Sequence, residues 1–150
     1  KEKLPEVEFK SVGTQDKSLD AISIEEVNSW SEYVDYEGPT NDVRPYIKKC
    51  HVYVLPSYHE GLPRSSLEAM SMGRPILTTY APGCKETVDE NINGFLVPIG
   101  SSKELANKMI WFVKNRDEIR SMGEQSRKIV EKRFDVRKVN QEMLNILEIS

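Results

Sequence analysis

The chain has 150 residues and a mass of 17.2 kDa, a size at which we expect one domain with a buried core rather than two. It is 38% hydrophobic and 30% charged, with no apolar run near the ~18 residues of a membrane-spanning helix, so we expect a soluble globular protein. The formal charge of -3, with 21 basic residues spread among 24 acidic ones, argues against a nucleic-acid partner.

Strand-like and helical segments alternate along the first third of the chain, which is typical of an α/β fold with a mostly parallel sheet. A continuous apolar run at 51–55 resembles a strand buried on both faces, so we expect a central strand there. In chain order we predict a strand at 7–13, a polar loop at 16–21, a helix at 24–31 after the capping residue Ser23, a strand at 33–36, a helix at 43–49 and the strand at 51–55.

The remaining two thirds continue this alternation and end in helices. Pro63 suits the first turn of a helix because its missing N–H would have no partner there, and Gly73 is a typical residue after a helix end. We therefore predict a helix from Pro63 to Gly73, strands at 75–79 and 94–98 separated by a loop that leads into a short helix, and then three helices. The first of these follows the capping pattern at 101–104, the second carries Ile119 and Met122, and the third follows Asp135 with the apolar positions Val136, Val139, Met143, Leu144 and Leu147.

The two cysteines, Cys50 and Cys84, stand far apart with neither a C-x-x-C pair nor a histidine cluster. This spacing indicates neither a zinc site nor a disulfide framework, and it favours a reducing cytoplasm. The first ten residues, KEKLPEVEFK, lack the apolar segment of a signal peptide and lead directly into a strand-like segment. We expect that the chain begins inside a longer protein.

Four short segments rich in glycine, proline and polar residues follow predicted strands, at 12–14, 38–42, 56–63 and 81–86. Ligands of open parallel sheets bind beyond the carboxyl ends of the strands, so we expect these segments to line one crevice. The turn at 60–62 precedes a helix, whose unpaired N–H groups and positive dipole end favour an anion such as a diphosphate.

Within that turn and helix, Glu60 and Glu68 are the candidate ligand-binding residues in the run EGLPRSSLE. A carboxylate accepts several hydrogen bonds from neighbouring hydroxyls, so one residue would suit a hexose and the other a ribose. Taken by themselves, two of 24 acidic residues are more often solvated than functional. Their context makes the pattern specific.

That context is residues 52–98, VYVLPSYHEGLPRSSLEAMSMGRPILTTYAPGCKETVDENINGFLVP, which resemble the carboxyl-terminal domain of family 4 glycosyltransferases of the GT-B fold. The resemblance extends over residues 7–134, and with NDVRPY it is greatest to the branch that builds bacterial capsular, lipopolysaccharide and lipid-linked oligosaccharides. It implies a Rossmann-like parallel sheet with helices on both faces, half of a GT-B fold lacking its first strand. It also implies a single nucleotide-sugar-binding domain over residues 1–150.

The resemblance further implies roles for single residues. Glu60 matches the glutamate that contacts the donor hexose at its reacting end, which makes it the catalytic candidate, and Glu68 matches the one that binds the ribose. The other donor-binding positions implied are Gly61 and Leu62 beside the sugar and diphosphate, Leu67 near the ribose, Gly13 at a strand end beside the donor, and Pro39 and Thr40 near the nucleobase. The family retains anomeric configuration and generally needs no metal, so we expect no metal and no cofactor, and a substrate linked to UDP.

The sequence also departs from the family pattern. The arginine and lysine that neutralise the diphosphate in the family lie upstream of the first strand here, as does the amino-terminal acceptor domain. We expect the whole enzyme to transfer a hexose to a lipid-linked or saccharide acceptor in the cytoplasm, at the inner face of the membrane through the missing domain. The isolated chain should not catalyse transfer. Two alternatives stay open, a nucleotide-sugar epimerase of GT-B architecture and a non-catalytic nucleotide-sugar-binding domain.

Overall fold

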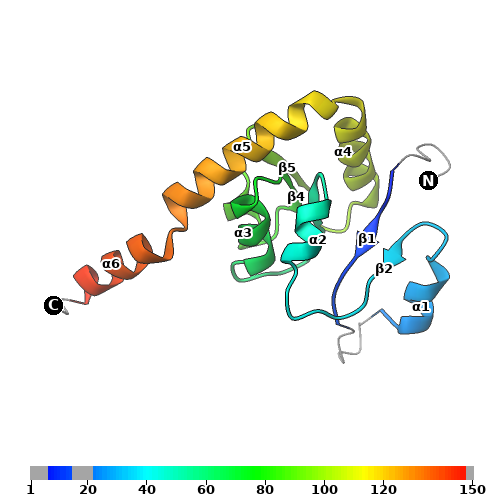
Figure 1. Ribbon diagram of the computed structural model, residues 1–150, viewed down its shortest axis with the longest axis horizontal. Helices are drawn as coiled ribbons and strands as arrows, with labels where there is room; N and C mark the ends of the chain where they lie inside the picture. Colours follow the sequence, from blue (N-terminus) through cyan, green and yellow to red (C-terminus); the bar gives the residue numbers. More distant parts are fainter. Residues whose placement is uncertain (1–6, 15–21, 148–150) are drawn as a thin grey trace. The chain divides into compact units, whose positions relative to one another are not determined.

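A computed structural model describes residues 7–14 and 22–147 of the chain. The chain divides into two compact units, Lys1–Tyr46 and Ile47–Ser150. The predicted polar loop at 16–21 lies outside the described residues. Figure 1 shows the order of the helices and strands along the chain. The prediction of a single domain over all 150 residues stays a prediction.

The described residues of the first unit form the two short parallel strands β1 (Lys10–Ser11) and β2 (Asp35–Tyr36), the helix α1 (Ile24–Ser29) and the start of α2 (Arg44–Lys49). Both strands are shorter than the predicted runs, because the parallel pairing that defines them joins only two residues of each. The ammonium group of Lys10 lies 3.5 Å from the carboxylate of Asp35 in β2 and 3.2 Å from that of Glu37, the residue after β2, so two carboxylates share one cation.

The second unit is built on a three-stranded parallel sheet in the order β3–β4–β5, formed by β3 (Tyr53–Leu55), β4 (Ile76–Thr79) and β5 (Gly94–Val97). The prediction of a central strand at 51–55 is wrong, since β3 lies at the edge of this sheet and pairs with β4 alone among the described strands. An apolar run indicates that both faces of a strand are buried, but it does not indicate how many strands pair with that strand. β4 is the central strand, and all four of its side chains are buried.

Helices cover both faces of this sheet. Neighbouring residues of a strand point to opposite faces, so the complete burial of β4 requires a covering layer on each side. Helix α2 (Arg44–Lys49) ends in the second unit. The other helices of this unit are α3 (Arg64–Ser71), the 3-10 turn η1 (Lys85–Thr87), α4 (Ser102–Lys114), α5 (Arg116–Arg133) and α6 (Val136–Ile146).

The core of the second unit lies between the sheet and the helices α4 and α5. It is formed by Leu77, Phe95 and Val97 of the sheet with Phe112 of α4 and Met122 of α5. The ring of Phe95 meets Trp111 edge-on at 4.7 Å and Phe112 at 5.3 Å between ring centroids. Both aromatic residues of α4 therefore serve packing.

Local signals set the helix ends. The hydroxyls of Ser23 and Ser101 accept the N–H groups of Glu26 and Glu104, so each caps the first turn of its helix as predicted. At the end of α3, Gly73 has φ +67° and the N–H of Arg74 donates to the carbonyl of Ala69, a Schellman arrangement that favours glycine. Pro63 stands one residue outside α3, at the capping position rather than in the first turn.

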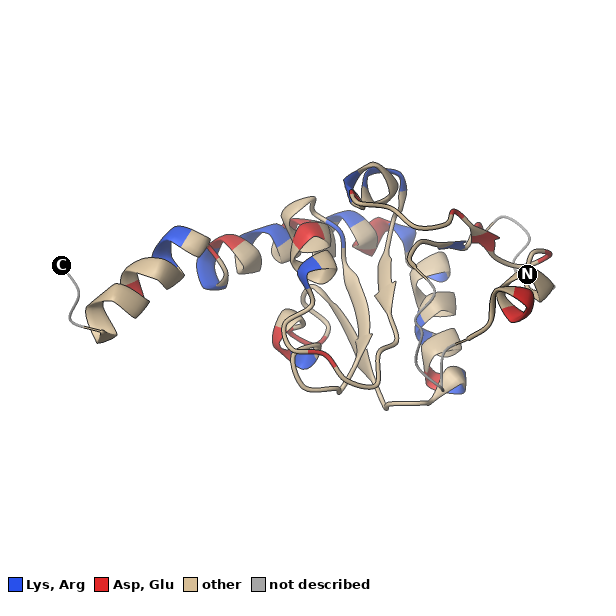
Figure 2. Ribbon diagram, turned by 90° about the horizontal axis from the view of Figure 1, so that it is seen from below, with Lys and Arg blue, Asp and Glu red and all other residues tan. Residues whose placement is uncertain are grey.

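The surface of α5 carries interspersed acidic and basic residues, which Figure 2 shows along the helix. Two ion pairs one helical turn apart, Arg120 with Glu124 and Arg127 with Glu131, link side chains of this surface. Within the described part of the chain, no helix is both long and apolar enough to cross a membrane.

Candidate functional site

The loops that follow β3 and β4 meet at the carboxyl edge of the sheet, as the sequence predicts for the segments 56–63 and 81–86. The contact is made through backbone, because a Cβ atom on Gly83 would overlap the carbonyl oxygens of Glu60 and Gly61. Gly83 also has φ +77°, a conformation that side-chain-bearing residues rarely adopt. The structure therefore brings the loop of Glu60 against the loop of Gly83.

Glu60 is half-buried in its loop, and its carboxylate has a defined partner. The hydroxyl of Ser57 donates a hydrogen bond of 2.9 Å to its Oε1 atom. A hydrogen bond to an ionised carboxylate is stronger than one between neutral groups and favours one orientation of the carboxylate.

Glu68 lies on α3, half-buried, in the fifth position of the helix. The two glutamates share a neighbour, Tyr53 of β3. Burial raises the pKa of the Tyr53 hydroxyl, its hydrogen bond to Ser65 opposes that rise, and the nearby charges of Glu60 and Glu68 add to it. The hydroxyl donates to Ser65 at 2.7 Å, which ties β3 to the first turn of α3. Both carboxylates thus help to raise the pKa of one half-buried phenol.

The first turn of α3 has no side-chain cap, because Pro63 at the capping position carries no acceptor. This distinguishes α3 from α1, α4 and α6, whose first turns are capped by Ser23, Ser101 and Asp135. Next to this turn, Gly61 and Leu62 are exposed, Leu62 by 44%, whereas Leu67 is half-buried. An uncapped helix start beside exposed backbone is suited to binding an anion.

The remaining predicted site residues, Gly13, Pro39 and Thr40, belong to the first unit. There the strand ends of β1 and β2 come together, since the N–H of Gly13 donates to the carbonyl of Gly38 at 3.1 Å. The hydroxyl of Tyr36 donates to the carbonyl of Gly13 at 2.7 Å. Thr40 is half-buried and its hydroxyl accepts the N–H of Asp42. A single crevice lined by both groups of residues stays a prediction.

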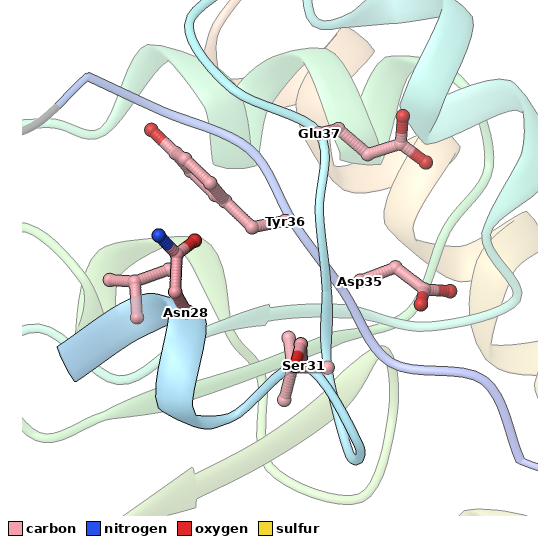
Figure 3. A pocket seen from close by; sticks show the side chains of 7 residues that line it. Asn28, Ser31, Asp35, Tyr36 and Glu37 are labelled. Atoms are coloured by element: carbon pink, nitrogen blue, oxygen red, sulfur yellow. The ribbon is translucent and has the colours of Figure 1, made fainter. Parts of the chain in front are cut away.

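The first unit also holds a pocket of about 320 Å³ between α1 and β2 (Figure 3). Asn28 and Ser31 line it beside Tyr36, which points to the opposite side of β2 from Asp35 and Glu37. None of the predicted site residues lines this pocket.

The described residues hold no group of three or more His, Cys, Asp and Glu side chains arranged for a metal ion. Both cysteines are free thiols. Burial raises the pKa of the Cys50 thiol, partly offset by Arg74, and Cys84 is completely buried. A reactive cysteine is exposed and has a lowered pKa, whereas Cys50 has a raised pKa and Cys84 is inaccessible to solvent.

Sequence reasoning placed Ser57 and Gly83 in segments expected to line the crevice but did not identify them as supports for Glu60, and it gave Tyr53 no role. The sequence contains a weak signal for one of them, since a glycine in a loop after a strand often marks a close backbone approach. Ser57 and Tyr53 carry no such signal, because their partners become neighbours only when the strands pair.

Comparison with known proteins identifies the family of the chain. Residues 1–115 match the family described as glycosyl transferases group 1. Over 101 residues the chain is 34% identical to the N,N'-diacetylbacillosaminyl-diphospho-undecaprenol alpha-1,3-N-acetylgalactosaminyltransferase of Campylobacter jejuni, which covers 67% of this chain and 26% of that protein. Over 146 residues it is 29% identical to an uncharacterized glycosyltransferase of Haemophilus influenzae, covering 97% of this chain and 41% of the relative.

Among solved structures, HepE of Anabaena in complex with UDP superposes with a TM-score of 0.85 at 26% identity, covering 96% of this chain and 41% of HepE. The chain thus spans between 26% and 41% of the length of these relatives. Because the family match covers more than half of the chain and the superposition nearly all of it, the protein belongs to the group 1 glycosyl transferases and has the α/β fold of one half of a GT-B enzyme.

Proposed function

We propose that this chain is the part of a retaining hexosyltransferase that holds the nucleotide-diphosphate sugar, with UDP as the nucleotide. The observation that carries the proposal is the placement of Glu60 on the loop after β3, held against the loop of Gly83, and of Glu68 on the helix α3 that follows. The two half-buried carboxylates offer acceptors for hydroxyls. The N–H groups at the uncapped start of α3 offer donors for a diphosphate.

In this proposal each residue has a distinct task. Glu60 accepts hydrogen bonds from the donor hexose near its reacting carbon, and Glu68 accepts them from the ribose hydroxyls. The N–H groups of the first turn of α3 face the diphosphate, which gains negative charge as it leaves. Donors that already point at the developing charge stabilise the transition state without having to reorganise.

The relatives support both the nucleotide and the kind of acceptor. HepE of Anabaena has been solved with UDP and with UDP-glucose. The Campylobacter relative, by its name, acts on a diphospho-undecaprenol-linked sugar. We therefore propose UDP-sugar as the donor and a lipid-linked or saccharide acceptor, reached at the inner face of the membrane through the part of the enzyme beyond this chain.

The length of the relatives bears on what this chain does by itself. The chain spans 26% of the Campylobacter protein and 41% of the Haemophilus one. We propose that acceptor binding belongs to the remainder, so the 150-residue chain binds the donor without transferring sugar. Measurable sugar transfer or epimerisation by this chain would contradict that division of labour.

Titration calorimetry with UDP and GDP tests the proposal directly. UDP should bind more tightly than GDP, and Glu68→Ala should weaken UDP binding about tenfold or more, because hydrogen bonds to a charged group are worth about 1.5–3 kcal/mol. Glu118→Ala, at an exposed position of α5, is the matched control and should leave the affinity unchanged. Failure of UDP and GDP to bind, or an unchanged affinity in Glu68→Ala, would overturn the proposed site.

A further inference from the structure

We infer that Ser57 is a positioning residue for Glu60 and that Thr79, at the end of the neighbouring strand, holds Ser57 in place. The inference rests on the proposed donor site, since its functional meaning depends on Glu60 contacting the hexose. Its structural part stands on a continuous chain of hydrogen bonds from β4 to the Glu60 carboxylate.

The chain of bonds begins where the pairing of β3 with β4 ends. Pro56 follows β3 and has no N–H to continue the ladder. Threonine hydroxyls of β4 take over at this point, with Thr78 donating to the carbonyl of Leu55 at 2.7 Å and Thr79 to that of Ser57 at 2.5 Å. The exit path of the chain from β3 is therefore set by side chains of the central strand.

Thr79 is itself well fixed. It is 2% exposed, and its hydroxyl oxygen lies 3.4 Å from the N–H of Ala81, which donates to it. A buried hydroxyl that both donates and accepts has little freedom to turn. The position of the Ser57 backbone is thus tied to the rigid centre of the sheet rather than to the exposed loop.

From this anchored backbone, the Ser57 hydroxyl donates to Oε1 of Glu60 across three residues of loop. A serine hydroxyl has one donor, and here a carboxylate oxygen takes it. The bond uses one lone pair of Oε1 and leaves the rest of the carboxylate able to accept from a sugar hydroxyl. Gly83 contacts the same loop from another side, against the carbonyls of Glu60 and Gly61.

Orientation of Glu60 before binding should improve binding of the hexose and not of the nucleotide. A flexible carboxylate loses conformational entropy when it is ordered by a ligand, whereas a carboxylate already held in place does not. UDP lacks the hexose, so it serves as an internal control for every variant. A residue that merely stabilised the fold would change both affinities or neither.

The test compares Ser57→Ala and Thr79→Val with the hydroxyl-preserving variants Ser57→Thr and Thr79→Ser, using titration calorimetry with UDP and UDP-glucose. We expect UDP-glucose to bind about three- to tenfold more weakly to the first pair, unchanged UDP affinity, and recovery in the second pair. Equal weakening for both ligands, or no recovery with threonine at position 57, would overturn the positioning role. Thermal unfolding of each variant identifies any that do not fold.

A second readout needs no ligand and therefore separates this inference from the proposed function. Three-bond NMR couplings report the side-chain rotamer of Glu60, which should be single in the free protein and in Ser57→Thr, and averaged in Ser57→Ala. A single unchanged rotamer in Ser57→Ala would overturn the inference even if UDP-glucose binds. If the unmodified chain binds neither UDP nor UDP-glucose, the proposed function is wrong, and the couplings still decide whether Ser57 orients Glu60.

Discussion

Helices α4 and α6 begin with the same kind of capping residue and carry the same kind of apolar stripe, yet they end in opposite environments. α4 places Phe112 in the core, 3% exposed, with Leu105 and Met109 packed beside it. α6 has no buried residue, and its apolar side chains remain exposed, from 38% at Val139 to 80% at Ile146.

This difference shows what an amphipathic pattern can and cannot report. The period of 3.6 residues shows that a helix has an apolar face, but the identity of the surface that covers it depends on distant parts of the chain. Helix α4 packs against β4 and β5, whereas the described residues do not bury the apolar face of α6. Helix α5 marks the transition, with its buried positions ending at Val130.

The largest expected contrast between the two helices is the cost of removing an apolar side chain. Phe112→Ala should lower the free energy of unfolding by about 3–5 kcal/mol, because it leaves a cavity beside Phe95. Ile146→Ala should change it by less than about 0.5 kcal/mol, because that side chain is already in water. Chemical denaturation followed by circular dichroism measures both. A large loss of unfolding free energy in Ile146→Ala would show that α6 packs against the rest of the second unit in solution.

A smaller effect is expected on α5, where the packed region ends. Alanine normally suits a helix better than glycine, but a Cβ atom on Gly123 would overlap the carbonyl oxygen of Gly73, where α5 crosses the end of α3. Gly123→Ala should therefore destabilise the protein by about 1–3 kcal/mol through overpacking. Ser121→Ala, at an exposed position of the same helix, is the control and should be neutral or slightly stabilising. A stabilised Gly123→Ala protein would mean that this helix crossing is looser than the structure shows.

The smallest effect concerns the helix caps and distinguishes global from local stability. Ser101→Ala should cost about 1 kcal/mol of global stability, because α4 is part of the core. Asp135 caps α6 through a 2.9 Å bond from the N–H of Arg137, so Asp135→Ala should speed amide hydrogen exchange within α6 and leave global unfolding unchanged. Hydrogen exchange read residue by residue checks this. Equal losses of global stability in both variants would remove the distinction between α4 and α6.

Much of the fold could be predicted because helix ends are local events. Ser23, Ser101 and Asp135 cap helices where the sequence places them, and Gly73 ends α3, since each acts on residues within one turn. The position of β3 could not be predicted in the same way. Its apolar residues resemble those of a central strand, but the neighbours of a strand depend on pairing between distant segments.

The candidate site divides along the same line. Glu60 and Glu68 are found from their motif, because the loop, the glycine and the following helix are contiguous in sequence. Ser57, Thr79 and Gly83 are not, because Thr79 stands 22 positions after Ser57 and meets it only through the register of β3 with β4.

The sequence by itself indicated the family, the alternation of strands and helices, and the two candidate glutamates, since all of these depend on residue types at short, regular spacings. Only the tertiary structure decided that β4 is the central strand, that the apolar face of α4 is buried while that of α6 is exposed, and that hydrogen bonds link Thr79 to Ser57 and Ser57 to Glu60. The physical reason is that burial and side-chain hydrogen bonds between strands are properties of segments brought together by folding, and a local pattern does not name its distant partner.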